Sequence, residues 1–298
     1  MLSLTRRAAF ALAFSLLAAD SVRSQEPTKK ADAPPPGLRV YSSGHSFHMF
    51  MPKILEEIAK SAGIEGHTQV GNSSIGGSYV HQHWAKEGDK SAKASIERDQ
   101  PDIFTMAPIY LPDDGIDNFV RLCSEKSPKT QITLQEFWLP HDVYDVNYKK
   151  QTPKFPDRDA MTAEYLRTEY GKYFKVMDDY VADINRKYSR PIVVVVPVGQ
   201  AVVALREKVI AGEVPGVTKQ SELFTDSIGH CKSQIMVLNA YCHYAVIYKR
   251  SPVGLPVPSA LKNAGGDKAG TEKLNTLLQE VAWKAVTSHP LSGVKASP

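Results

Sequence analysis

Long hydrophobic runs and clustered charges are scarce in this chain of 298 residues. Its longest apolar stretch, Ala8 to Ala19, is shorter than the roughly 20 residues that a membrane-spanning helix needs. Basic residues are dispersed, since Lys29-Lys30 and Lys149-Lys150 are the only adjacent lysine pairs. The net charge is only +4 and no basic run reaches five residues, so we expect no nucleic-acid partner.

Cysteine is also rare, with three residues in the whole chain. Cys231 and Cys242 lie eleven residues apart on one predicted helix, where a rise of about 1.5 Å per residue places them beyond disulfide reach. No disulfide framework is implied, and no Cys/His spacing resembles a zinc site. The chain also lacks a Walker loop and a dinucleotide fingerprint. We therefore expect neither a metal nor a cofactor.

The first residues carry the order of an export signal. Arg6-Arg7 precede the apolar stretch, and small residues surround a cleavage position after Ser24. Residues 1–24 are therefore predicted to be a signal peptide and the mature protein periplasmic or extracellular, free of the membrane. An uncleaved anchor is the alternative. Residues 25–36 are polar and end in Ala-Pro-Pro-Pro, which predicts a disordered linker before a single domain at 37–298.

Short apolar strands alternate with helical patterns through this domain. The predicted strands are Leu38–Ser42, Thr68–Gly71, Asp102–Ala107, Gln131–Phe137 and Ile192–Val198. The predicted helices are Met49–Ala62, Ile116–Ser124, Ala160–Lys187, Gln200–Ala211, Cys231–Tyr248 and Thr271–Val286. The alternation predicts a three-layer α/β/α sandwich with a five-stranded parallel sheet, which carries its site at the carboxyl ends of the strands.

Ser46 follows the first predicted strand and precedes a helix. Its hydroxyl lies on a strand-to-helix turn, where free backbone N–H groups and the positive helix end would stabilise an oxyanion. Ser46 is thus a candidate nucleophile, and the alternative is that it caps the helix.

Two other segments could complete such a site. The paired glycines Gly76-Gly77 follow the second strand and allow backbone N–H groups to approach a ligand closely, although an ordinary turn also explains them. Asp226 and His230 precede a late helix, where the carboxylate could orient the imidazole as a base for a serine. The alternatives are a helix cap and a surface histidine, with His141 beside Asp142 as a rival pair.

Together these blocks resemble the SGNH/GDSL hydrolase superfamily. The resemblance lies in Ser46, in Gly76-Gly77-Ser78 with His83-Trp84, and in Asp226 and His230 followed by the segment from Tyr241 to Tyr248. More closely, the chain is similar to exported bacterial proteins of this kind with a Gly-x-Ser-Phe opening. The resemblance implies that Ser46 is the nucleophile, His230 the base and Asp226 its partner. It also implies an oxyanion hole made by the N–H groups of Ser46 and Gly77.

The chain departs from the family pattern in two places. The third block of the family supplies an Asn side chain to the oxyanion hole, but here the third strand ends Thr105-Met106-Ala107-Pro108. Gln135 is our first candidate for the missing donor and Asn72 the second. The spacing Asp-x-x-x-His is also one residue longer than the usual Asp-x-x-His of the family.

The sequence thus predicts an exported serine esterase that hydrolyses small acyl esters, with O-acetyl groups of a polysaccharide as one candidate substrate. Aromatic residues near strand ends are candidates for stacking on sugar rings. The residues expected to bind substrate are His45, Ser78, His83, Trp84 and Trp138. The alternative is a carbohydrate-binding or scaffold protein on the same fold that has lost catalysis, because function resides in the site rather than the fold.

Overall fold

A computed structural model describes residues 33–144 and 157–296 of the chain. The described residues from Pro34 onward belong to one compact unit. The predicted signal peptide, and the predicted linker up to residue 32, lie outside the described residues. Within the described part, no helix has the length and apolar character to cross a membrane.

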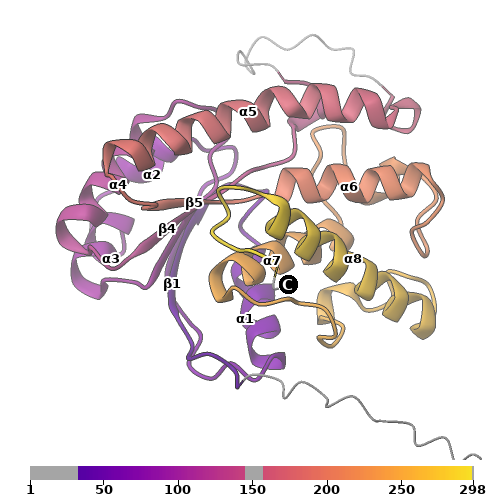
Figure 1. Cartoon of the computed structure of the whole chain (residues 1–298), viewed down its shortest axis with the longest axis horizontal. Coiled ribbons are helices and arrows are strands. Elements are labelled where there is room, and N and C mark those ends of the chain that lie inside the picture. The colour runs from indigo at the N-terminus through magenta and orange to yellow at the C-terminus, as the bar shows by residue number, and fades with distance from the viewer. Residues whose placement is uncertain (1–32, 145–156, 297–298) are drawn as a thin grey trace, which may run out of the picture. The chain divides into compact units, whose positions relative to one another are not determined.

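Five parallel strands form one sheet in the order β2-β1-β3-β4-β5 (Figure 1). The strands are β1 (Arg39–Gly44), β2 (Thr68–Ser74), β3 (Ile103–Met106), β4 (Gln131–Gln135) and β5 (Val193–Val196). Each pair is parallel, and β1 lies between β2 and β3. This is the flavodoxin-like order, in which ligands bind where the chain switches from one side of β1 to the other. The predicted fold class is therefore confirmed.

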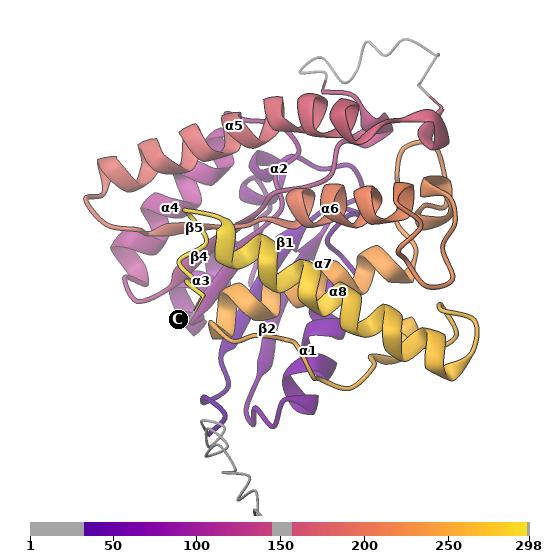
Figure 2. The ribbon, with the colours of Figure 1, turned by 45° about the vertical axis from the view of Figure 1, so that its right-hand side comes forward.

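Helices cover both faces of the sheet (Figure 2). One layer contains α1 (Met51–Ser61), α6 (Val198–Ile210), α7 (Ser233–Tyr248) and α8 (Lys268–Ser288). The other contains α2 (Val80–Trp84), α3 (Ala92–Asp99), α4 (Asp114–Lys126) and α5 (Ala163–Lys187). Short 3-10 helices occur at Pro140–Asp142, Arg158–Ala160, Gln220–Leu223 and Ser259–Leu261. A hydrogen bond from Tyr180 of α5 to Asp117 of α4 joins two helices of the second layer.

Local sequence explains where several of these elements begin. Pro52 lies in the first turn of α1. Backbone N–H groups there have no acceptor within the helix, so the lack of an N–H in proline costs no hydrogen bond. The side chain of Thr162 accepts a hydrogen bond from the backbone N–H of Tyr165 and caps α5. The four valines of β5 are all buried, as expected for a strand that helices cover on both faces.

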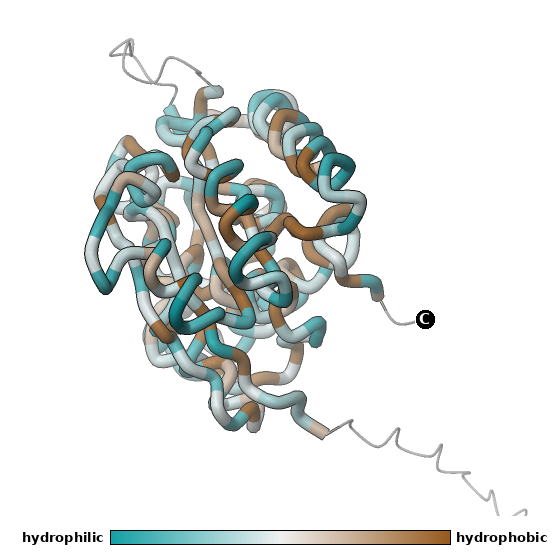
Figure 3. The backbone as a smooth tube through the Cα atoms, turned by 90° about the vertical axis from the view of Figure 1, so that its left-hand side faces the viewer, coloured by the Kyte–Doolittle hydropathy of each residue, from teal (hydrophilic) through white to brown (hydrophobic). Residues whose placement is uncertain are grey.

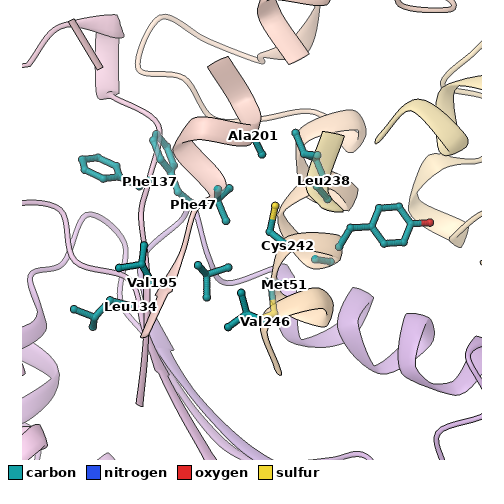
Figure 4. Close-up of a cluster of buried hydrophobic side chains, with 14 of the residues drawn as sticks. Phe47, Met51, Leu134, Phe137, Val195, Ala201, Leu238, Cys242 and Val246 are labelled. Carbon is teal, nitrogen blue, oxygen red and sulfur yellow. The ribbon is translucent and has the colours of Figure 1, made fainter. Parts of the chain in front are cut away.

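The hydrophobic core fills the space between the sheet and its helix layers. Figure 3 shows hydrophilic and hydrophobic stretches following each other along the helices, which is typical of elements with one buried side. Figure 4 shows part of the core, where Leu238 and Cys242 of α7 lie on one side of the strands and Leu134 and Val195 of β4 and β5 point to the other side. All three cysteines are buried and free, and burial raises the pKa of each thiol.

Candidate active site

A pocket of about 350 Å³ opens at the carboxyl ends of the strands. Its lining comes from the segments that follow β1, β2, β3 and β4, together with the loop before α7. The lining residues are His45, Ser46, Phe47, Gly76, Gly77, Ile109, Phe137, Pro140, Ile228 and His230. The pocket therefore lies at the switch point of the sheet, where the fold class predicts a ligand site.

Ser46, His230 and Asp226 form a continuous chain of hydrogen bonds at this pocket. The Ser46 Oγ lies 3.0 Å from His230 Nε2, and His230 Nδ1 lies 2.6 Å from Asp226 Oδ2. A carboxylate only accepts hydrogen bonds, so His230 Nδ1 carries a proton and Nε2 is free to accept from the serine hydroxyl. The structure thus places the Ser46 hydroxyl and the His230 ring within the predicted hydrogen-bond distance.

The Asp226 carboxylate is held by its own loop. Its Oδ1 accepts the backbone N–H groups of Gly229 and His230, at 2.9 and 3.1 Å. Burial raises the pKa of this carboxyl, but the hydrogen bonds from His230 and Gly229 outweigh burial, and the pKa is lowered overall. The longer Asp-x-x-x-His spacing is accommodated because Gly229 adopts a positive φ of 106°, which a glycine tolerates.

Residues outside the loop fix its position. Trp138 Nε1 donates to the Gly229 carbonyl at 2.8 Å, and the Arg158 guanidinium donates to the carbonyls of Asp226 and Ser227. Arg158 is in turn paired with Asp142 at 2.7 Å. Sequence reasoning did not single out Arg158, whose guanidinium contacts the His230 loop.

The rival pair His141 and Asp142 has a structural role. Asp142 is buried, pairs with Arg158 and Arg206, and accepts a hydrogen bond from Tyr170. Burial raises the pKa of Asp142, but the two guanidinium groups outweigh this and lower it overall. The carboxylate oxygens of Asp142 are therefore occupied by their contacts with Arg158, Arg206 and Tyr170.

Ser46 is not a helix cap, because α1 begins at Met51 and its N-cap is Phe50. A tight turn separates β1 from α1, in which the His45 carbonyl accepts the N–H groups of His48 and Met49. The Ser46 N–H has no hydrogen-bond partner within residues 33–144 and 157–296. This leaves a free donor beside the hydroxyl, as an oxyanion site requires.

The Gly77 N–H is the second backbone donor at the pocket, and it too has no acceptor in the described part of the chain. Gly77 has a φ of 60°, in the region that favours glycine, and a Cβ there would meet open space. The loop is anchored by His83, whose ring nitrogens lie 2.7 Å from Ser73 Oγ and 2.7 Å from Ser78 Oγ. His83 and Ser78 are thus buried supports of the loop rather than substrate-binding groups.

The two residues expected to supply a third oxyanion donor lie away from the pocket. Gln135 is fully buried and its Nε2 donates to the Phe47 carbonyl at 3.1 Å. Asn72 is exposed on the edge strand β2 and lines a different hollow. The expectation for both residues does not fit this geometry, because strand residues alternate between faces and these two side chains face elsewhere.

Of the five residues expected to bind substrate, only His45 lines the pocket. Trp138 is fully buried and stacks on Phe47 with ring centroids 4.5 Å apart. Trp84 packs edge-on against Phe119 in the layer of α2 and α4. Trp138 is therefore a core residue, and Trp84 is a half-buried residue that packs against the core.

His45 is almost completely buried, and burial lowers its pKa to about 3, with the neighbouring histidines His48, His83 and His230 acting in the same direction. Its Nδ1 accepts the Phe47 N–H at 3.3 Å, so the imidazole is neutral with the proton on Nε2. The remaining pocket walls are apolar, formed by Ile109, Phe137, Pro140 and Ile228. Sequence reasoning missed these four, since nothing in a lone apolar residue distinguishes a pocket wall from the core.

Within the described residues, no group of three or more His, Cys, Asp or Glu side chains could hold a metal ion. The site offers backbone hydrogen-bond donors, a serine hydroxyl and an imidazole that bonds to it. Such groups are suited to acyl transfer.

Comparison with known proteins gives a likeness of fold. No protein-family model matches the chain, and no curated protein matches its sequence. Among solved structures, a DUF4886 family protein from Bacteroides uniformis superposes with a TM-score of 0.58 at 14% identity, over 88% of this chain and 98% of the other. A "putative GDSL-like lipase" from Parabacteroides merdae reaches a TM-score of 0.39 at 15% identity, over 70% of this chain and 95% of the other. The first likeness supports the α/β fold alone, and the second is too low to carry an argument.

Proposed function

We propose that this protein is a serine ester hydrolase of the SGNH/GDSL type that cleaves small acyl esters. The observation that carries the proposal is the chain of hydrogen bonds from Ser46 through His230 to Asp226 at a pocket with two free backbone N–H groups. A serine hydroxyl is a weak nucleophile unless an adjacent base takes its proton. His230 is such a base, and Asp226 holds it in the required tautomer.

In this mechanism the Ser46 Oγ attacks the acyl carbonyl carbon while its proton passes to His230 Nε2. The negative charge on the carbonyl oxygen is stabilised by the N–H groups of Ser46 and Gly77. The ester C–O bond then breaks as His230 returns the proton to the leaving alcohol. Water, activated by the same imidazole, releases the acyl group from Ser46.

The pocket has room for an acyl group beside the serine. Its volume is about 350 Å³, and its walls beside the serine are apolar. Outside the lining, Tyr79 stacks on the exposed His81 with ring centroids 5.4 Å apart, and the Tyr110 ring centroid lies 6.3 Å from that of Tyr79. These rings follow the pocket residues Gly77 and Ile109 closely in the chain. They favour an alcohol part with a sugar face, as in an O-acetylated polysaccharide.

Hydrolysis of an ester series from acetyl to octanoyl by wild type and Ser46→Ala tests this function. We expect turnover to be highest for acetyl to butyryl esters and to be abolished in Ser46→Ala, with no change in thermal stability. Failure of wild type with every short ester would contradict the proposal.

The proposed oxyanion hole has two backbone donors and lacks the side-chain donor that the family pattern adds. This lack favours a second candidate function, a carbohydrate-binding protein that has lost catalysis. An oxyanion-hole donor is worth about 2.7–4 kcal/mol of barrier stabilisation. In this candidate, sugars stack on the rings of Tyr79 and Tyr110, and the Ser46→Ala protein binds them as well as wild type.

The site is proposed to work outside the cytoplasm, as in exported bacterial proteins with a Gly-x-Ser-Phe opening. The support is the signal-like order of residues 1–24. Mass spectrometry of exported protein should find Gln25 as the first residue. An intact Met1 would contradict export with cleavage.

A further inference from the structure

A buried polar cluster contacts the turn of residues 45–49, which carries Ser46 and is called the nucleophile turn here. It joins Gln135 at the end of β4, Asn239 and His243 of α7, and His48 of the turn before α1. All four side chains are essentially inaccessible to solvent. These residues are distant in sequence, so the fold gathers them at one point.

Gln135 is the centre of this cluster. Its Oε1 accepts hydrogen bonds from His48 Nδ1 at 2.7 Å, Asn239 Nδ2 at 3.0 Å and His243 Nε2 at 3.1 Å. The Phe47 carbonyl can only accept, so the Gln135 Nε2 must face it and the Oε1 must face the three nitrogens, which therefore donate. Burial lowers the pKa of His48 to about 4 and of His243 well below its usual value, so both imidazoles stay neutral.

The cluster forms hydrogen bonds with one backbone group of the nucleophile turn, the carbonyl of Phe47. Gln135 Nε2 donates to this oxygen at 3.1 Å and Asn239 Nδ2 donates to it at 3.2 Å. The N–H of the same residue is held by His45 Nδ1. The residue after Ser46 is therefore fixed at both its N–H and its carbonyl.

The Phe47 side chain extends this hold to the base. Its ring stacks on Trp138 with an interplanar angle of 6°, and it meets the His230 imidazole edge-on at 5.5 Å. Trp138 also donates to the Gly229 carbonyl in the His230 loop. One residue thus links the nucleophile turn to the loop that carries the base.

We propose that Gln135 and Asn239 are positioning residues that set the Ser46 hydroxyl and N–H against His230 through the Phe47 carbonyl. The inference rests on the proposed function. A misplacement of about 1 Å is enough to cost roughly 100-fold in rate. This contact matters because the Ser46 N–H, one of the two proposed oxyanion-hole donors, takes its direction from the turn.

The test compares Asn239→Leu with Asn275→Leu. Asn275 is a matched control, since its buried amide also bonds a backbone carbonyl and a side chain, the Leu255 oxygen and the Tyr241 hydroxyl, but lies outside the cluster. We expect Asn239→Leu to lower kcat and the rate of Ser46 labelling by a phosphonate about 10- to 100-fold, with KM within about twofold. Asn275→Leu should keep both rates while losing comparable thermal stability. Equal kcat in the two variants would overturn the inference.

Two further measurements keep the outcome clear. If Asn239→Leu does not fold, Asn239→Ser takes its place, and it should show the same split between kcat and KM. Hydrogen exchange of the His48 and Met49 amides, which donate to the His45 carbonyl, reports the turn without any activity. Faster exchange in the Asn239 variant than in the Asn275 variant supports the inference, and equal exchange contradicts it. A wild type that is inactive and unlabelled contradicts the proposed function instead.

Discussion

At the scale of single residues, the pair Asp226 and His230 underlies the chemistry proposed for the site. The carboxylate accepts both a ring N–H and two backbone N–H groups, so it is fully used in orienting the imidazole. Both side chains remain partly exposed, with 39% of His230 accessible. Substrate and water can therefore reach the base without a large movement.

Replacing Asp226 by Asn tests this orientation. An amide can present an N–H to His230 Nδ1 and so favour the tautomer with its proton on Nε2, which cannot accept the serine proton. We expect Asp226→Asn to lower kcat by about 10²–10⁴-fold with KM little changed. Ser227→Ala, an exposed change in the same loop, should retain activity in the same ester assay. Full activity of Asp226→Asn would refute the role given to the carboxylate.

The contrast between Ser46 and Gln135 shows what single residues reveal in a sequence. Ser46, Asp226 and His230 could be singled out because each lies where a strand or loop meets a helix. Gln135 could not be placed, since its face of the sheet depends on where β4 ends and on what packs above it. The strand stops at Gln135 instead of continuing to Phe137 as predicted, and the side chain points to α7.

At the scale of elements, Asp113 joins the loop of Gly77 to the rest of the fold. Its buried carboxylate accepts the N–H groups of Val80 and His81 at the start of α2, and of Gly115 at the start of α4. Gly115 is required there because a Cβ would lie 2.3 Å from the His81 nitrogen. One side chain thus caps two helices and sets the segment that follows Gly77.

Asp113→Ala should therefore destabilise the protein by about 2–3 kcal/mol, because three backbone donors lose their acceptor. The matched change Asp114→Ala removes an exposed acidic residue from the first turn of α4 and should cost no more than about 1 kcal/mol. Urea denaturation of both variants gives the comparison. Equal midpoints would show that the double cap contributes little.

The sequence predicted the long helices better than the short ones. α1, α4, α5, α6, α7 and α8 were all expected, with ends shifted by no more than three residues, since each presents a long apolar face or run. α2 and α3 were missed because five and eight residues give no clear period. Their positions follow instead from tertiary contacts such as the Asp113 cap.

At the scale of the whole molecule, the alternation of strands and helices was enough to predict the parallel sheet and the place of the pocket. It was not enough to predict the polar groups buried inside the sandwich. Glu136 is one of them, fully buried after β4, with its carboxylate accepting from the backbone and side chain of Gln200. Burial raises the pKa of Glu136 to about 7, although His289 and Gln200 act in the opposite direction.

This carboxyl makes stability depend on pH. In the unfolded chain it titrates near pH 4.3, whereas the folded protein retains its proton to about pH 7. Its contribution to the free energy of unfolding is therefore full below about pH 4 and is lost as the pH rises through 7. Between pH 5 and pH 8, the free energy of unfolding of wild type, measured by urea denaturation, should fall by about 2–3 kcal/mol relative to that of Glu136→Gln. A constant difference between the two proteins over this range would contradict the raised pKa.

The central claim is that Ser46 is a nucleophile activated by His230. The most direct measurement is covalent labelling by a serine-directed fluorophosphonate, followed by peptide mapping of wild type and His230→Ala. We predict one adduct per chain, on Ser46, and labelling at least about 100-fold slower in His230→Ala. No adduct on wild type, or an adduct on another serine while Ser46 stays unmodified, would contradict the account.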